Sequence, residues 1–351
     1  MTNPEIEALV EAANARYSDA DRNRIIRGTP GDEPRFELYH FHLSLCSYKV
    51  RTTLDEKNAS YLSHDIEIFP PPLQNYYPEY VKLRLKGGEA LDADLVNGYT
   101  GRSSTETEGF DPCVVPTMVD HEAGKVLVNS KRTSLYLDSV LDTGTKLVPD
   151  DIADQVIAQV DIIDRSPHVA ILYCANPDGD LRPEFVQQGM PHVHDAKIAG
   201  SQANMAKAGN DPALIAAYEH KIVKEAAAKK FVRTEKDMRS AIQEFRNVIA
   251  QLEQDLEASD GDWMFGKRFT MADLYWAVSL WRIKWVGYWH IIESDGALHF
   301  PRVAAYTKRV LDRPSFQRSV IHWPLHPTSD HVMEYYEDVA EQNRRLAAEG
   351  N

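Results

Sequence analysis

Residues 114–130 read Val-Val-Pro-Thr-Met-Val-Asp-His-Glu-Ala-Gly-Lys-Val-Leu-Val-Asn-Ser. The apolar run at 114–119 predicts a strand that is entered across a proline, and residues 125–128 predict the strand that returns. The His-Glu-Ala-Gly sequence between them is typical of a turn, so the two strands should form a hairpin. The closing Asn-Ser pair suits the start of a helix, which we expect to run to about Leu141.

The residues before this hairpin predict an alternation of strands and helices. Phe-Glu-Leu-Tyr-His-Phe-His-Leu at 36–43 has the alternating, aromatic-rich pattern of a strand. A second strand is expected at 61–68, where three prolines end it. Helices are expected at 48–57 and at 76–85. The order strand–helix–strand–helix–strand–strand–helix, with a proline opening the third strand, indicates a thioredoxin-like α/β domain over residues 36–147.

The sequence from residue 150 onward predicts helices only, which indicates an all-α second domain over residues 148–330. Apolar stripes with helical spacing mark most of these segments. Thr270 and Asp273 form a capping-box pattern at the start of a buried helix. The expected helices are at 152–163, 211–231, 235–256, from 270 on, 301–310 and 314–321. Three further segments complete the division: a polar N-terminal extension at 1–35, an inserted loop at 86–111 and a C-terminal tail at 331–351. Within the extension, the apolar spacing at 4–17 predicts a short helix.

Composition excludes several classes of protein. A length of 351 residues suggests about two domains. The net charge of −14 argues against a nucleic-acid partner and against an acidic membrane surface. Three cysteines are too few for a disulfide scaffold or a cysteine-rich metal site. With no secretory signal pattern and no run of about 18 apolar residues, a cytoplasmic protein is expected.

Cys46 is the first candidate for chemistry. It follows the first strand, at the start of the first helix, where free amide groups and the helix dipole favour a thiolate. Most free cysteines are only small packing residues, which is the competing interpretation. Ser44 and Ser47 flank it, and either hydroxyl could stabilise a thiolate or cap the helix.

Histidines and late aromatic residues are the other candidates. The thirteen histidines show no metal-binding spacing, so we expect no metal site, including at His-Val-His 192–194 on an expected loop. His168 follows Ser-Pro at a helix start and is a candidate acid, base or hydrogen-bond partner for a phenol. Trp285 and Tyr288 share a helix face, which favours an aromatic substrate-binding wall, with core packing as the alternative.

The arrangement resembles the glutathione transferase superfamily at four residues. Val115 and Pro116 match its cis-proline position, where backbone groups pair with the cysteinyl part of glutathione. Asn129 and Ser130 match the pair at a helix N-terminus that binds the γ-glutamyl carboxylate, although Asn129 is an amide where many transferases have an acid. The resemblance implies glutathione as a cosubstrate.

A closer resemblance is to the glutathione-dependent reductive dehalogenases of halogenated hydroquinones. It rests on Ser-Leu-Cys-Ser-Tyr-Lys-Val at 44–50 and spans about residues 33–326. Further blocks lie at 33–38, 80–85, 108–112, 114–117, 167–170, 177–180, 220–225 and 277–280. It implies that glutathione displaces halide from a substrate such as 2,5-dichlorohydroquinone, and that Cys46 then takes the glutathione as a mixed disulfide. Neither metal nor nicotinamide is then needed, the partners are glutathione and a small aromatic molecule, and a homodimer is possible.

Two alternatives stay open at the level of sequence. The first is a transferase of the same fold that conjugates glutathione or cleaves aryl ethers and stops at the thioether. It would not require Cys46. The second is a non-catalytic transferase-like binding module, for which the long insertion at 86–111 could be a docking loop.

Overall fold

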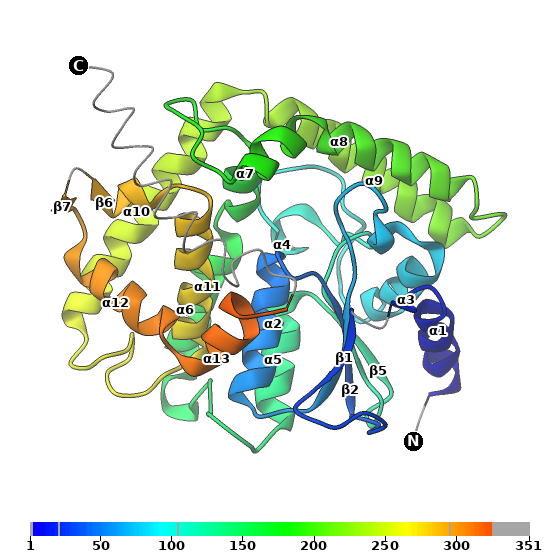
Figure 1. Ribbon diagram of the computed structural model, residues 1–351, viewed down its shortest axis with the longest axis horizontal. Coiled ribbons are helices and arrows are strands. Elements are labelled where there is room, and N and C mark those ends of the chain that lie inside the picture. Colours follow the sequence, from blue (N-terminus) through cyan, green and yellow to red (C-terminus); the bar gives the residue numbers. More distant parts are fainter. Residues whose placement is uncertain (1–2, 20–21, 104, 295, 325–351) are drawn as a thin grey trace.

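The computed structural model describes residues 3–19, 22–103, 105–294 and 296–324, and it shows a mixed sheet domain beside a helical one (Figure 1). The sheet has five strands in the order β1-β3-β2-β4-β5. Their bounds are β1 Asn23–Ile26, β2 Phe36–His40, β3 Tyr61–Asp65, β4 Thr117–Asp120 and β5 Lys125–Val128. Strands β2 and β3 are parallel, with Phe36 opposite Tyr61, and every other neighbouring pair is antiparallel. The thioredoxin-like arrangement and the predicted hairpin are thereby confirmed.

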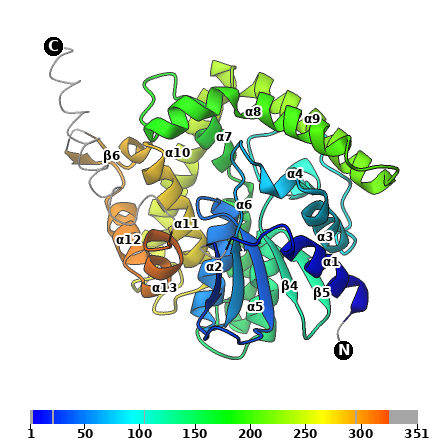
Figure 2. The ribbon, with the colours of Figure 1, turned by 45° about the vertical axis from the view of Figure 1, so that its right-hand side comes forward.

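Helices cover both faces of this sheet. Helices α2 and α5 pack together on one face, and α1 and α3 lie on the other (Figures 1 and 2). Alternation along β2 explains the division, because Leu38 packs with the α2 residue Val50 whereas Tyr39 joins the cluster that holds α1. The bounds are α1 Pro4–Asn14, α2 Leu45–Glu56, the 3₁₀ turn η1 Gln74–Tyr76, α3 Pro78–Gly88, α4 Thr105–Glu108 and α5 Ser130–Val140.

The segment before residue 36 is part of the sheet domain, in contrast with the polar surface extension that the sequence predicts. Helix α1 buries Ile6, Val10 and Ala13, which recur at helical spacing and reach the core. Strand β1 pairs along β3, with Ile25 opposite Leu62. Its four residues, Asn-Arg-Ile-Ile, are all half-buried. An edge strand this short and half polar shows little alternation of apolar and polar residues, so the sequence pattern does not predict it.

The second domain is built around one buried helix. Helix α11 buries almost every residue and packs against α2, α6 and α12. Thr270 and Asp273 form the predicted capping box at its start. The bounds are η2 Asp150–Ile152, α6 Ala153–Arg165, α7 His168–Tyr173, α8 Glu184–Met205, α9 Pro212–Phe231, α10 Glu235–Ala258, α11 Met271–Trp285, η3 Trp289–Ile291, β6 Glu293–Ser294, β7 Ala297–Leu298, α12 Pro301–Leu311, α13 Pro314–Phe316 and η4 Gln317–Ile321.

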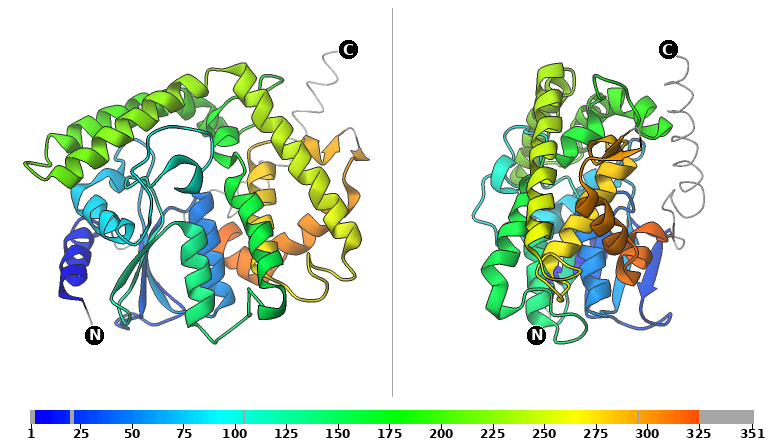
Figure 3. Two further views of the ribbon diagram at one scale, coloured as in Figure 1. Left: turned by 180° about the vertical axis from the view of Figure 1, so that it is seen from behind. Right: turned by 90° about the vertical axis from the view of Figure 1, so that its left-hand side faces the viewer.

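Helix α8 occupies a segment that the sequence predicts to be a loop. It contains Pro191, which removes one backbone donor and argues against a helix. A buried stripe that includes Val186, Met190 and Val193 nevertheless holds the helix together by packing. Helices α8 and α9 form an antiparallel pair that arches over the sheet domain (Figures 1 and 3). This pair roofs the site described below.

The predicted tail at 331–351 lies outside the described residues. None of the helices in the described part of the chain is sufficiently long and apolar to span a bilayer.

Candidate active site

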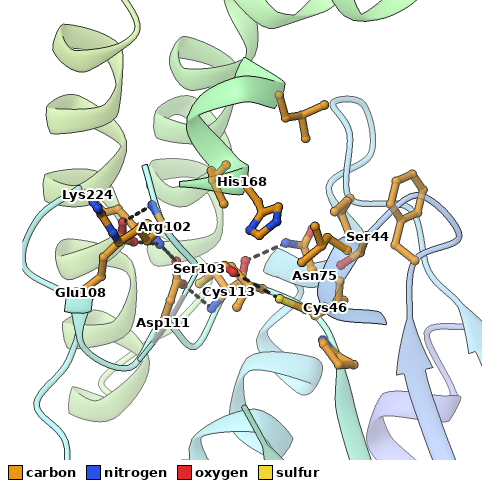
Figure 4. Close-up of a pocket in the computed structure, with 18 of the residues that line it drawn as sticks. Ser44, Cys46, Asn75, Arg102, Ser103, Glu108, Asp111, Cys113, His168 and Lys224 are labelled. Atoms are coloured by element: carbon orange, nitrogen blue, oxygen red, sulfur yellow. Dashed lines mark hydrogen bonds and ion pairs between the residues drawn. The ribbon is translucent and has the colours of Figure 1, made fainter. Parts of the chain in front are cut away.

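A cavity of about 170 Å³ lies where the two domains and the inserted segment meet (Figure 4). Its lining comes from the start of α2, the loop before β4, the start of α5, the insertion, and helices α6 to α9. Seven of the ten predicted site residues are part of this lining: Ser44, Cys46, Val115, Pro116, Asn129, Ser130 and His168.

Cys46 lies in the first turn of α2 and is partly exposed. Ser44 is the N-cap of this helix and its hydroxyl accepts a hydrogen bond from the Ser47 amide at 3.3 Å. The Cys46 thiol is 3.5 Å from the hydroxyl of Ser103, which the inserted segment supplies (Figure 4). The helix N-terminus and the Ser103 hydroxyl both lie beside the sulfur, where they can stabilise negative charge that develops on it during a reaction. No motif or residue spacing in the sequence identifies Ser103 as part of the site.

Ser47 is not part of the cavity lining. It is fully buried, and its hydroxyl accepts a hydrogen bond from the Phe41 amide at 3.2 Å. The structure thus separates the two serines. Ser44 caps the helix and borders the cavity, whereas Ser47 ties α2 to the end of β2.

Two backbone features lie in the same cavity lining as Cys46. The peptide bond between Val115 and Pro116 is cis. Neither the amide nor the carbonyl of Val115 is hydrogen-bonded within the described part of the chain. Asn129 caps α5 by accepting from the Arg132 amide at 3.2 Å, and its left-handed φ of 70° turns the chain so that Ser130 begins the helix at the cavity. The N-terminus of α5 therefore offers amide groups to an anion.

The inserted segment forms one wall and is fixed from both sides. Inside it, Glu108 accepts hydrogen bonds from the Thr100 amide at 2.8 Å, the Thr100 hydroxyl at 2.7 Å and the Arg102 amide at 3.2 Å. Outward, Arg102 makes a bidentate ion pair with Glu244 of α10 at 2.6 and 2.8 Å. Arg102 also donates to the Arg165 carbonyl at 2.6 Å. The described part of this segment links the two domains and presents Ser103 to Cys46.

His168 lies beside the cavity with both ring nitrogens engaged. Nε2 is 2.7 Å from the Ser279 hydroxyl, and Nδ1 is 3.2 Å from the Ser166 carbonyl. Burial, together with the charges of Lys49 and Arg282, lowers the pKa of His168 well below its usual value. A neutral ring with both nitrogens paired is suited to forming a wall and has no free atom for acid–base work.

Trp285 and Tyr288 are not brought to this cavity. Both are 2% exposed and belong to the hydrophobic core of the helical domain. The Trp285 ring packs with Arg282, whose guanidinium carbon is 5.3 Å from the ring centroid. The expected shared helix face does not exist, because α11 ends at Trp285 and Tyr288 lies beyond it, just before η3. For Trp285 the sequence held a signal against a substrate wall, since apolar residues recur on all sides of α11, which is the pattern of a buried helix.

The inner end of the cavity holds buried charges that the sequence analysis missed. Lys221 of α9 is 2.7 Å from Asp111 and 2.8 Å from Glu225, and Lys224 is 3.2 Å from Asp111. Burial alone would raise the pKa of Asp111, yet the two ammonium groups hold it well below its usual value. Lys221, Lys224 and Glu225 are three and four residues apart on α9, a spacing that places them on one face of the helix.

The other two thiols are buried. Cys113 and Cys174 are at most 1% exposed. Burial raises the pKa of Cys113 far above its usual value and that of Cys174 to about 12. Among the residues that the structure describes, no three His, Cys, Asp or Glu side chains gather in a way that could hold a metal ion.

Comparison with known proteins agrees with this architecture. The profile of the family "Glutathione S-transferase, C-terminal domain" matches residues 212–309. Two curated proteins, from two strains of Sphingobium indicum and both named 2,5-dichlorohydroquinone reductive dechlorinase, are 49% identical over 332 residues, which is 93% of this chain and 94% of theirs. The crystal structure of beta-etherase LigF from Sphingobium sp. strain SYK-6 superimposes with a TM-score of 0.53 at 13% identity, covering 81% of this chain and 98% of that one, and shows the shared fold. The chain belongs to the glutathione transferase superfamily, within the family of these reductive dechlorinases.

Proposed function

We propose that the protein uses glutathione to remove chlorine reductively from chlorinated hydroquinones such as 2,5-dichlorohydroquinone. Near half-identity over 93% of the chain to two proteins named for that reaction supports the substrate class. The observation that carries the mechanism is the position of Cys46. A partly exposed thiol begins a helix in the same cavity as Val115 and Ser130. A protein thiol at that point can take a sulfur from a glutathione-linked intermediate.

Glutathione would lie between the loop before β4 and the start of α5. The free amide and carbonyl of Val115 can pair with the cysteinyl backbone of glutathione, as an added strand pairs with a sheet edge. The amides at the start of α5 and the Ser130 hydroxyl suit the γ-glutamyl carboxylate. This placement directs the glutathione sulfur toward the start of α2, where the Ser44 hydroxyl can donate to a thiolate.

The reaction then follows from sulfur chemistry. An aryl carbon–chlorine bond resists displacement, but the ketone tautomer of a hydroquinone carries chlorine on a saturated carbon next to a carbonyl. The glutathione thiolate attacks that carbon, chloride leaves, and a glutathionyl hydroquinone forms. The Cys46 thiolate attacks the glutathione sulfur, and the carbon–sulfur electron pair returns to the ring, which takes a proton. A second glutathione thiolate attacks the mixed disulfide, which releases oxidised glutathione and frees Cys46.

Replacement of Cys46 distinguishes this mechanism from simple conjugation. Purified Cys46→Ser protein is supplied with glutathione and 2,5-dichlorohydroquinone, and products are separated by chromatography. We expect it to release chloride but to accumulate the glutathionyl hydroquinone, while the buried control Cys174→Ala yields monochlorohydroquinone as the unchanged protein does. Equal monochlorohydroquinone from Cys46→Ser would refute the role of Cys46. A thioether as the end product of the unchanged protein would instead identify a conjugating transferase.

A further inference from the structure

His194 borders the cavity but has no part in the sulfur chemistry above. It lies on α8, in the roof that the helix pair adds to the fold, and is 3% exposed. Its neighbour two residues back, His192, is exposed to solvent. The pair that the sequence predicts on a loop is thus split by the helix into one outward and one inward ring.

The protonation of His194 is defined by its partner. Nδ1 is 2.7 Å from a carboxylate oxygen of Glu225, and a carboxylate can only accept, so Nδ1 carries the hydrogen. Burial lowers the pKa of His194 despite this carboxylate, so the ring is neutral and Nε2 bears a lone pair. Within the described residues Nε2 is buried and has no hydrogen-bond partner. A carboxylate that orients an imidazole whose second nitrogen is free is the arrangement of a general base.

Other polar groups of the lining are also without partners. The Tyr76 hydroxyl and the side-chain oxygen of Asn75 are buried and form no hydrogen bond in the described part of the chain. Tyr76 is 0% exposed and Asn75 is 4% exposed. Leaving such groups unpaired costs free energy, which a ligand with matching polar atoms would recover. The inner end of the cavity is therefore built for a small molecule that carries hydroxyl groups.

We propose that His194 is the general base that takes the proton of a phenolic hydroxyl of the bound hydroquinone, and that Glu225 positions its ring. This inference rests on the proposed function and adds to it the residue that starts tautomerisation. The O–H bond breaks, an N–H bond forms on Nε2, and the electron pair stays on oxygen. The imidazolium then returns that proton to the neighbouring ring carbon as the C=O bond forms, so no proton is gained or lost. The resulting ketone is the form that the glutathione thiolate attacks.

The charged groups around the ring act in two directions. Glu225 stabilises the imidazolium that forms. Lys197 on α8 and Lys221 on α9, which are 3.9 and 2.8 Å from that carboxylate, help burial to lower the pKa of His194 and keep the resting ring neutral. Tyr173 of α7 and Tyr99 of the insertion pack their rings against His194, with centroids 5.1 and 6.2 Å away. Burial raises the pKa of Tyr99, so that hydroxyl stays neutral.

Chloride release by four variants tests the proposal: His194→Gln, His194→Ala, Glu225→Gln and the exposed control His192→Gln. With 2,5-dichlorohydroquinone and saturating glutathione, we expect His194→Gln to lose about 100-fold or more in kcat and Glu225→Gln to lose less, because its amide still accepts from Nδ1. His192→Gln should match the unchanged protein. The loss in His194→Gln should shrink with tetrachlorohydroquinone, whose more acidic hydroxyls need less help. Added imidazole should restore part of the rate of His194→Ala. If His194 has a purely structural role, the rates with both substrates should fall equally and added imidazole should not restore activity.

The outcomes separate this inference from the proposed function. If the unchanged protein releases chloride and His194→Gln does so as fast as His192→Gln, the inference is overturned and the proposed function stands. If the unchanged protein releases no chloride from any chlorinated hydroquinone, both fail. If His194→Gln does not fold, the proposal can still be tested on the unchanged protein. Its chloride release should slow at least about twofold in D₂O, because the base transfers a proton in the step. Equal rates in H₂O and D₂O would also overturn the inference.

Discussion

Ser103 is the one hydrogen-bonding neighbour that the described residues provide for the Cys46 sulfur, at 3.5 Å. The Cys46 thiol donates to this hydroxyl, and the same hydroxyl can turn to donate to the sulfur when it carries negative charge during the reaction. The start of α2 acts in the same direction through its free amides. Reactivity at this residue therefore depends on one group from the helix and one from the insertion.

Ser103→Ala tests the part that the hydroxyl plays. Loss of a hydrogen bond to a charged group costs about 1.5 kcal/mol, so alkylation of Cys46 by iodoacetamide at neutral pH should slow roughly tenfold. The sealed thiols Cys113 and Cys174 should stay unmodified in the folded protein, which makes the assay specific. An unchanged alkylation rate would mean that the helix start alone activates Cys46.

At the scale of an element, helix α1 is attached through a buried carboxylate. Glu37 on β2 is 3% exposed and accepts from His121 Nε2 at 3.0 Å. The other nitrogen of His121 is 3.2 Å from Glu7 of α1. The hydrogen bonds to Glu37 and Glu7 raise the pKa of His121 to about 9. A charged imidazole thus clamps α1 to the sheet at neutral pH.

This clamp predicts a loss of stability at alkaline pH. Because the folded pKa is above the unfolded value of about 6.5, the stabilisation is complete below pH 6.5 and is lost as pH rises through about 9. Urea midpoints measured from pH 6 to pH 10 should fall more steeply for the unchanged protein than for His121→Gln. Parallel curves for the two proteins would contradict the assignment.

The inserted segment is a second element whose position can be tested. Arg102→Gln removes the ion pair with Glu244 and should free Ser103 to move away from Cys46. Activity should fall by up to about tenfold, because small displacements at a reacting group are costly, while the melting temperature should change little. Arg268→Gln breaks a similar exposed ion pair, with Asp151, far from the cavity and serves as the control. Equal activity of the two variants would show that the insertion is held in place by other contacts.

At the scale of the whole molecule, a buried ion pair joins the two domains. Lys49 of α2 and Asp164 of α6 are 2.8 Å apart, with side chains 0% and 6% exposed. Lys49→Met should lower the free energy of unfolding by about 3–5 kcal/mol, because Asp164 is left buried without its ion-pair partner. The double variant with Asp164→Leu should recover most of that loss in urea denaturation. Additive losses in the double variant would argue against direct coupling.

The sequence was sufficient to predict what periodicity and local chemistry control. The β4–β5 hairpin, the caps at Asn129 and Thr270, and Cys46 at a helix start all follow from neighbouring residues. What could not be predicted depends on long-range packing. Ser103 reaches Cys46 across 57 residues, and Trp285 faces the core because α11 is enclosed on all sides. Helix α8 forms despite its proline because α9 packs along it.

The central claim is that Cys46 carries glutathione during turnover, and intact-mass spectrometry tests it most directly. The protein is mixed with glutathione and 2,5-dichlorohydroquinone and is quenched with acid during the steady state. Its intact mass is then measured, and peptide mapping locates any adduct. We predict one glutathione per chain, attached to the peptide that contains Cys46 and removed by a reductant. Chloride and monochlorohydroquinone released at an undiminished rate by Cys46→Ser, with no adduct on the unchanged protein, would contradict the account.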